Sequence, residues 1–324
     1  MEQKSNNAGL KRWWHRFLGL TILLCVASFF GSFGWFFDLL AHFRLQYFFF
    51  HMLGLLSVIP SKKPVLLYSL LLLIVVNGLT IFPIYSAAPM RKSKEVGLSL
   101  LEINLWRVHP QKSLVRDYLV KKEADLLVLV EMTAQWEKEL ITIKEKYPYG
   151  LTVSRQDNFG LALWSRLPLT NCKKHSFDKE DRPAISAVAR VNSDEIHIIV
   201  AHPPPPKHPR YFRLRNAYFM NLVKLRKEGQ RTVVIGDLNT PSWSHYFQNL
   251  CKEMKLRDSR QGFGIHATWP TIFPFLLTPL DHCLISDGLQ VVKRDLGPNL
   301  WSDHYPLLLQ LSVSSLGRST STKE

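Results

Sequence analysis

Asp237 and Asn239 are the residues of this chain whose types and spacing suggest chemistry most directly. They follow the apolar run 233–235, which has the length and the β-branched residues of a buried strand. Gly236 frees the backbone to turn, and the one-residue spacing lets both polar side chains point to the same side of an extended chain. A carboxylate and a carboxamide placed there can hold and polarise a water molecule, or bind an anion whose charge a metal neutralises. Taken alone, the stretch is equally compatible with an Asx turn that closes a strand.

The same pattern, an apolar strand that ends in a polar residue capable of metal binding or proton transfer, recurs along the chain. In one further case the polar residue stands at the start of the strand. The further positions are Asn104, Glu131, His202, Asp303 and His304 at strand ends and Asp281 at a strand start. Oxygen donors without a cysteine favour a hard cation such as Mg²⁺ or Mn²⁺, and histidines beside them can move protons. Such a set suits metal-assisted hydrolysis of a phosphoester by in-line attack of water.

The elements that must position these residues alternate between strands and helices from about residue 95 onward. Continuous apolar runs and period-two patterns predict strands at 96–105, 126–130, 161–164, 184–191, 196–200, 233–235, 280–285 and 307–311. Helical periodicity predicts helices at 111–123, 133–146, 211–227 and 242–254. In a layered α/β domain, one edge of the sheets can gather the strand-end residues into a single cleft.

The charge balance favours anionic partners. The 324-residue chain carries 41 Lys and Arg against 26 Asp and Glu, a formal net charge of +15. A basic stretch directly after His202 includes Arg210 and Arg213, which we expect to bind phosphate or lipid headgroups near the cleft. A solvated basic helix face is the alternative for this stretch. The four cysteines form no CxxC pair, which argues against a zinc site.

Residues 1–90 differ in character from the rest and predict a membrane region. Three apolar segments, about 17–37, 45–60 and 64–83, have the composition of transmembrane helices, although the second is short for a span. A signal peptide is the competing interpretation of the first. The basic residues before the first segment and the Lys62-Lys63 loop both favour the cytoplasmic side, which puts the C-terminal part on the outer side if all three segments cross. If the second does not cross, that part is cytoplasmic.

The ordered set of strand-end residues, with its two short motifs Gly236-Asp237-Leu238-Asn239 and Ser302-Asp303-His304, resembles the endonuclease/exonuclease/phosphatase family, which includes deoxyribonuclease I. The stretch 40–47, LAHFRLQY, is similar to a bacterial membrane-anchored branch of that family. The resemblance implies an α/β (α+β) four-layer sandwich of two mostly antiparallel sheets flanked by helices, over about residues 91–315. A disordered tail at 316–324 would follow. The apolar segments and the resemblance to this branch predict a multi-pass protein of the bacterial inner (cytoplasmic) membrane, and the charge pattern with three spans puts the catalytic domain on the outer, periplasmic side.

The resemblance further assigns roles to the set. Glu131 matches the main metal ligand, and Asn104 and Asp303 would support that metal or a second one, Mg²⁺ or Mn²⁺. Asp237 and Asn239 would position or activate the water. The remaining roles are His304 on the phosphoryl oxygens, Asp281 orienting His304, and His202 as a second acid/base or a clamp.

The expected function is hydrolysis of a phosphodiester or phosphomonoester, with nucleic acid, a phospholipid headgroup or a soluble phosphoester as substrate. A non-catalytic relative that binds anionic lipid or a protein partner is the alternative. Two departures from the family pattern affect substrate contacts: Val130 stands where many members carry Gln, and Trp106 stands where an acid is common.

Overall fold

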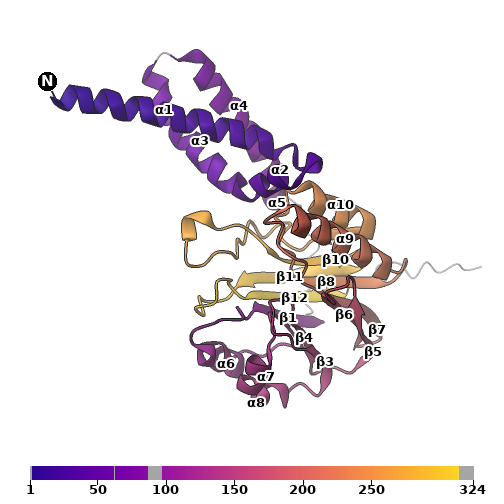
Figure 1. Cartoon of the computed structure of the whole chain (residues 1–324). Helices are drawn as coiled ribbons and strands as arrows, with labels where there is room; N and C mark the ends of the chain where they lie inside the picture. Colours follow the sequence, from indigo (N-terminus) through magenta and orange to yellow (C-terminus); the bar gives the residue numbers. More distant parts are fainter. Residues whose placement is uncertain (1, 62, 87–96, 314–324) are drawn as a thin grey trace, which may run out of the picture.

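The computed structural model describes residues 2–61, 63–86 and 97–313. Its C-terminal part is built on two six-stranded sheets packed face to face (Figure 1). The first sheet has the order β11 (Leu289–Leu296), β12 (Leu307–Val313), β1 (Leu98–Asn104), β2 (Leu126–Val130), β4 (Leu161–Ser165), β3 (Tyr149–Val153). The second has the order β5 (Leu169–Ser176), β6 (Pro183–Val191), β7 (Asp194–Ala201), β8 (Arg231–Asp237), β10 (Asp281–Ser286), β9 (Leu256–Asp258).

Helices cover the outer face of each sheet, so the domain has four layers. Aliphatic side chains of both sheets, such as Val128 and Ile198, fill the central core. The first sheet is covered by α6 (Lys112–Lys121), α7 (Ala134–Glu139) and α8 (Ile141–Lys144), and the second by α9 (Pro209–Leu225) and α10 (His245–Met254) (Figure 1). Both faces of β2 are therefore buried, which is why its five residues are all apolar. The expected sandwich is confirmed.

Register explains why the polar residues meet at one edge. In each sheet the central pair of strands is parallel: β1 with β2 across α6, and β7 with β8 across α9. The pairing of Asn104 with Val130 puts Asn104 and Glu131 at the same end of the first sheet. In the second sheet β10 runs antiparallel to β8 and pairs Asp281 with Asp237, so the start of one strand meets the end of the other. The remaining pairings are antiparallel, as expected.

The N-terminal region is a helical bundle that projects from the sandwich (Figure 1). It consists of α1 (Glu2–Ser28), α2 (Trp35–Leu40), α3 (Arg44–Val58), α4 (Pro64–Ile81) and α5 (Pro83–Ser86), with 3₁₀ turns at Gly31–Phe33, Ala41–Phe43 and Ile59–Ser61. Helix α3 packs against both α1 and α4. The end remote from the sandwich holds basic residues of both α1 and the α3–α4 turn, since Lys63 Nζ lies 2.9 Å from His15 Nδ1.

The bundle departs from the three expected spans both in the first segment and in the number of candidates. The segment 17–37 is not a single helix, because α1 ends at Ser28 and a Gly-containing turn separates it from α2. By length and composition, two helical stretches qualify as candidate membrane spans among the described residues, Trp35–Val58 and Pro64–Tyr85. Lys62, the expected boundary near residue 90, and the expected tail at 316–324 lie outside the described residues.

Two buried neutral histidines predict acid sensitivity of the sandwich. Burial lowers the pKa of His282 to about 3 and that of His197 to about 4. An unfolded histidine binds a proton below about pH 6.5, so the unfolded state binds more protons than the folded state between these values. The free energy of unfolding should therefore fall as the pH drops below about 6.5, by up to about 1.4 kcal/mol per pH unit for each histidine. Thermal unfolding of the full chain across this range measures the slope. His282→Gln should flatten it, while His245→Gln on the exposed start of α10 should not; equal slopes would contradict the assignment.

Candidate active site

A cavity of about 600 Å³ opens at the edge where the strand ends of both sheets meet. Six of the expected site residues line it: Glu131, His202, Asp237, Asn239, Asp303 and His304. Asn104 and Asp281 lie directly behind, each in contact with a lining residue. The structure thus brings together eight side chains that are spread over two hundred positions of the chain.

Asp237 is the centre of the cluster. Its Oδ2 accepts a hydrogen bond from Asn104 Nδ2 at 3.2 Å and lies 3.4 Å from His202 Nε2 and 3.7 Å from His304 Nε2. Its Oδ1 accepts the backbone N–H of Asn239 at 2.8 Å. Burial alone would raise the pKa of Asp237, but the two histidines and this backbone bond outweigh it and lower the pKa. Asp237 is therefore ionised at neutral pH.

Gly236 makes this placement possible. Its φ of 141° lies outside the range that residues with a side chain readily adopt, and a Cβ at this position would overlap the carbonyl oxygen of Ala201 on β7. The close approach of β8 to β7 carries Asp237 to the cavity beside His202.

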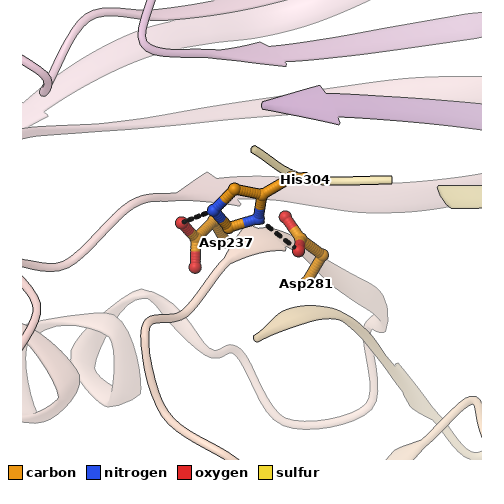
Figure 2. Close-up of side chains that lie close together, drawn as sticks. All are labelled: Asp237, Asp281 and His304. Carbon is orange, nitrogen blue, oxygen red and sulfur yellow. Dashed lines mark hydrogen bonds and ion pairs between the residues drawn. The ribbon is translucent and has the colours of Figure 1, made fainter. Parts of the chain in front are cut away.

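His304 lies between two carboxylates (Figure 2). Its Nδ1 donates to Asp281 Oδ2 at 2.7 Å, while its Nε2 faces Asp237. Burial would lower the pKa of His304, but the charges of Asp281 and Asp237 raise it well above the usual value. The pKa of His202 is also raised, since its ion pair with Asp237 outweighs its burial. The cavity therefore presents two imidazoles whose protonated forms Asp237 stabilises.

Glu131 and Asp303 are the cavity carboxylates that form no ion pair with another described residue. Glu131 Oε2 accepts the backbone N–H of Arg107 at 2.7 Å, and Oε1 accepts Asn158 Nδ2 at 3.1 Å. Asp303 Oδ2 accepts Trp269 Nε1 at 3.3 Å, and its buried Oδ1 has no hydrogen-bond partner among the described residues. Burial raises the pKa of both Glu131 and Asp303. Glu131 has a φ of 62° and Asn239 a φ of 50°, so both are held in a strained backbone conformation at the site.

The donor set fits a hard divalent cation. Carboxylates buried near one another repel, and a bound cation removes that cost; it would also satisfy Oδ1 of Asp303. Oxygen donors from Glu131 and Asp303, with Asn104 close by, match the preference of Mg²⁺ or Mn²⁺. The atoms of Asp237, Asp281 and His304 also lie within 4.8 Å of one another, which is close enough to share an ion. There, however, Nδ1 of His304 is already engaged by Asp281, so this trio is better described as an imidazolium clamped by two acids.

The two expected substrate-binding arginines lie away from the cavity. Arg210 pairs with Glu180, and Arg213 is exposed on α9. Both lie on the exposed side of α9, whose opposite side packs Tyr218, Phe219 and Leu222 on the sheet. From the same basic stretch, Lys207 lines the cavity; it precedes α9.

The sequence interpretation assigned no site role to Glu102 or to His42. Glu102 on β1 is fully buried, and its burial together with the neighbouring charges of Asp281 and Asp237 raises its pKa well above the usual value. It is therefore a neutral carboxyl behind the cluster. Asn158 holds Glu131, and His42 of the N-terminal region lines the cavity. Glu102 stood out in the sequence as the one charged residue inside the apolar strand 98–103.

Removing the charge of Asp281 should expose the role of His304. Asp281→Asn keeps the shape of the side chain but loses the negative partner of His304 Nδ1, so the pKa of His304 should fall. We expect kcat for a phosphodiester to drop by about a hundredfold, and the alkaline limb of the rate profile to move to lower pH. Asp287→Asn, in the exposed turn after β10, is the matched control. An Asp281→Asn variant with an unshifted pH profile would count against the assignment.

Comparison with known proteins supports what the geometry indicates. The model of the "Endonuclease/Exonuclease/phosphatase family" matches residues 101–304, more than half of the chain. A search of curated proteins found no match. Among solved structures, an endonuclease/exonuclease/phosphatase from Beutenbergia cavernae is similar with a TM-score of 0.54 and 14% identity, over 68% of this chain and 72% of that one.

Two eukaryotic structures share the fold as well. A humanized D. rerio TDP2 aligns with a TM-score of 0.55 and 13% identity, over 67% of this chain and 99% of that one. The human Nocturnin catalytic domain with bound sulfate aligns with a TM-score of 0.55 and 17% identity, over 67% of this chain and 94% of that one. At these identities the structures establish the fold, and the family model establishes the family. The chain belongs to the endonuclease/exonuclease/phosphatase family.

Proposed function

We propose that this protein is a membrane-anchored, divalent-metal-dependent phosphoester hydrolase. The family is generally hydrolytic on phosphoesters. The observation that carries the proposal is a single cavity in which Glu131, Asp237 and Asp303 meet two histidines of raised pKa. Acidic groups suited to a cation and cationic groups suited to a phosphate are what hydrolysis of a phosphoester requires.

In this proposal each residue has a distinct role in catalysis. Glu131 and Asp303, with Asn104 in support, would hold Mg²⁺ or Mn²⁺, which when bound neutralises phosphate charge and orients the reacting groups. Asp237 and Asn239 position the attacking water. His304 and His202 donate hydrogen bonds to the phosphoryl oxygens, and Asp281 keeps the ring of His304 oriented and charged. Lys207 at the cavity attracts the anionic substrate.

The N-terminal bundle supports the membrane part of the proposal. Trp35–Val58 and Pro64–Tyr85 have the length and composition of spans. Basic residues near Lys63 lie at the end of the bundle remote from the sandwich (Figure 1). By the positive-inside rule that end faces the cytoplasm, and the catalytic domain faces the outer, periplasmic side of a bacterial inner membrane. A reporter fused to the C-terminus, active only outside the cytoplasm, tests this orientation; activity only inside would overturn it.

The full chain, purified in detergent, tests the catalytic part. Bis(p-nitrophenyl) phosphate and p-nitrophenyl phosphate probe diester and monoester cleavage with Mg²⁺, with Mn²⁺ and with EDTA. We expect metal-dependent release of p-nitrophenol that EDTA abolishes. Turnover that persists in EDTA would overturn the metal dependence. Absence of turnover with either metal would favour the non-catalytic relative that binds anionic lipid or a protein.

A further inference from the structure

The N-terminal region is fixed to the catalytic domain by a buried polar joint. Asp38 Oδ2 forms an ion pair with Arg215 NH2 at 2.6 Å, and both side chains are completely buried. Asp38 Oδ1 accepts Ser244 Oγ at 2.7 Å. Three residues further on, Ala41 O accepts Trp243 Nε1 at 2.5 Å. The segment that joins α2 to α3 is therefore held against α9 and the start of α10.

This joint carries three side chains of the N-terminal region into the catalytic cavity. Leu39, His42 and Phe43 line the same cavity as Glu131 and Asp237. His42 Nδ1 lies 3.2 Å from Leu39 O, and its Nε2 lies 3.4 Å from the backbone oxygen of Asn239, so the ring connects the segment to the strand end that holds Asp237. One wall of the active site thus comes from the helical bundle, and two of the three side chains in it are apolar.

An apolar loop of the catalytic domain adjoins this wall. Gln46 Nε2 on α3 donates to Phe275 O at 3.1 Å and to Leu277 O at 3.3 Å. Leu276 between them lines the cavity, while Ile272, Phe273 and Phe275 expose 61%, 49% and 74% of their surface. Figure 1 shows this loop beside the lower end of the bundle. Large exposed apolar side chains next to candidate spans suit the surface of a bilayer better than water.

We propose that the substrate is a phospholipid drawn from the membrane, with its phosphodiester at Glu131, Asp237 and His304 and the first part of its acyl chains on Leu39, Phe43 and Leu276. This inference rests on the proposed function and narrows its substrate. Nucleic acid fits the wall less well, because its backbone calls for cations along a groove, and the wall formed by Leu39, Phe43 and Leu276 offers none. In the reaction one P–O ester bond breaks; water gives its hydroxyl to phosphorus and its proton to the departing alcohol oxygen.

The main comparison of the test is between two phosphodiesters, one with acyl chains and one without. DNA and an aryl phosphodiester serve as further substrates. The full chain in nanodiscs receives dioleoyl phosphatidylglycerol within the bilayer, and in parallel soluble glycerophosphoglycerol, duplex DNA, single-stranded DNA and bis(p-nitrophenyl) phosphate. We expect kcat/KM for the long-chain lipid to exceed that for the chain-free diester by at least about tenfold, the gain expected from burying apolar surface on the wall. Equal rates for both diesters, or preference for DNA, would overturn the lipid assignment while leaving phosphoester hydrolysis intact. Loss of all turnover, including that of bis(p-nitrophenyl) phosphate, would instead overturn the proposed function.

A matched pair of variants distinguishes the contribution of the apolar wall to substrate preference from the contribution of membrane attachment. Phe43→Ser should lower the long-chain to chain-free ratio by about tenfold. Phe36→Ser, in the same segment and also partly exposed, is the control and should leave the ratio unchanged. Leu276→Ser, on the catalytic domain, provides a second variant of the wall that does not alter the bundle. If neither Phe43→Ser nor Leu276→Ser changes the ratio in folded protein, the subsite is not where we place it.

Discussion

Glu131→Gln should abolish metal-dependent hydrolysis, lowering kcat/KM by about a thousandfold or more, because a bound cation contributes several kcal/mol of transition-state stabilisation. Glutamine has nearly the same shape and can still accept from the backbone N–H of Arg107, so the local fold should persist. What the variant loses is the negative charge that attracts the cation. The affinity for Mn²⁺, measured by calorimetry on the full chain, should fall together with the rate.

The matched control is Glu145→Gln, an exposed glutamate after α8 that should retain full activity and Mn²⁺ affinity. Measuring both the rate and the Mn²⁺ affinity of Glu131→Gln separates loss of cation binding from loss of a direct role on the substrate. If Glu131→Gln binds Mn²⁺ as tightly as the unchanged protein but turns over slowly, Glu131 acts on the substrate and the cation lies elsewhere. If both rate and affinity are unchanged, the cavity is not the catalytic site.

The predicted elements show where sequence patterns carry information. Each central strand was predicted within a few residues, since strands covered on both faces, such as β2 and β7, are continuous apolar runs. The four strands that were missed, β3, β5, β9 and β11, are the four edges of the two sheets. An edge strand pairs on one side only and is partly exposed, so β5 reads LTNCKKHS and resembles a polar loop. Likewise, the expected helix 133–146 is divided into α7 and α8 at Leu140.

The candidate site was predictable to the extent that residues act at strand ends. Asn104 and Glu131 could be placed at one edge because the parallel neighbours β1 and β2 end on the same side, and the same holds for His202 and Asp237 after β7 and β8. Arg210 was misplaced because helix phase decides which basic residues of a stretch face the cleft, and charge alone does not reveal it. His42 could not be assigned at all. Its place in the cavity depends on how the bundle docks on the sandwich, and that depends on long-range contacts such as the one between Asp38 and Arg215.

This docking contact gives the second large expected effect. Asp38→Ala leaves the guanidinium of Arg215 completely buried without its charge partner, and removal of one member of a buried ion pair typically costs about 3–5 kcal/mol. Thr240 Oγ1, which accepts from Arg215 NH1 at 2.8 Å, offers a hydrogen bond but no countercharge. Thermal unfolding of the full chain in detergent should therefore begin about 10 °C lower than for the unchanged protein.

Comparison with a partly exposed pair isolates the effect of burial. Asp194 and Arg231 lie 2.8 Å apart, close to the 2.6 Å of Asp38 and Arg215, but both remain about one-third exposed. Asp194→Ala should cost about 1 kcal/mol or less, because water screens the pair and solvates the charge that remains. The double variant Asp38→Leu with Arg215→Met should recover most of the loss, since it removes both charges together. If Asp38→Ala costs no more than Asp194→Ala, the bundle is held to the sandwich by its apolar contacts and its uncharged hydrogen bonds, such as that between Ala41 and Trp243. The wall formed by Leu39, His42 and Phe43 would then not depend on the buried charges beneath it.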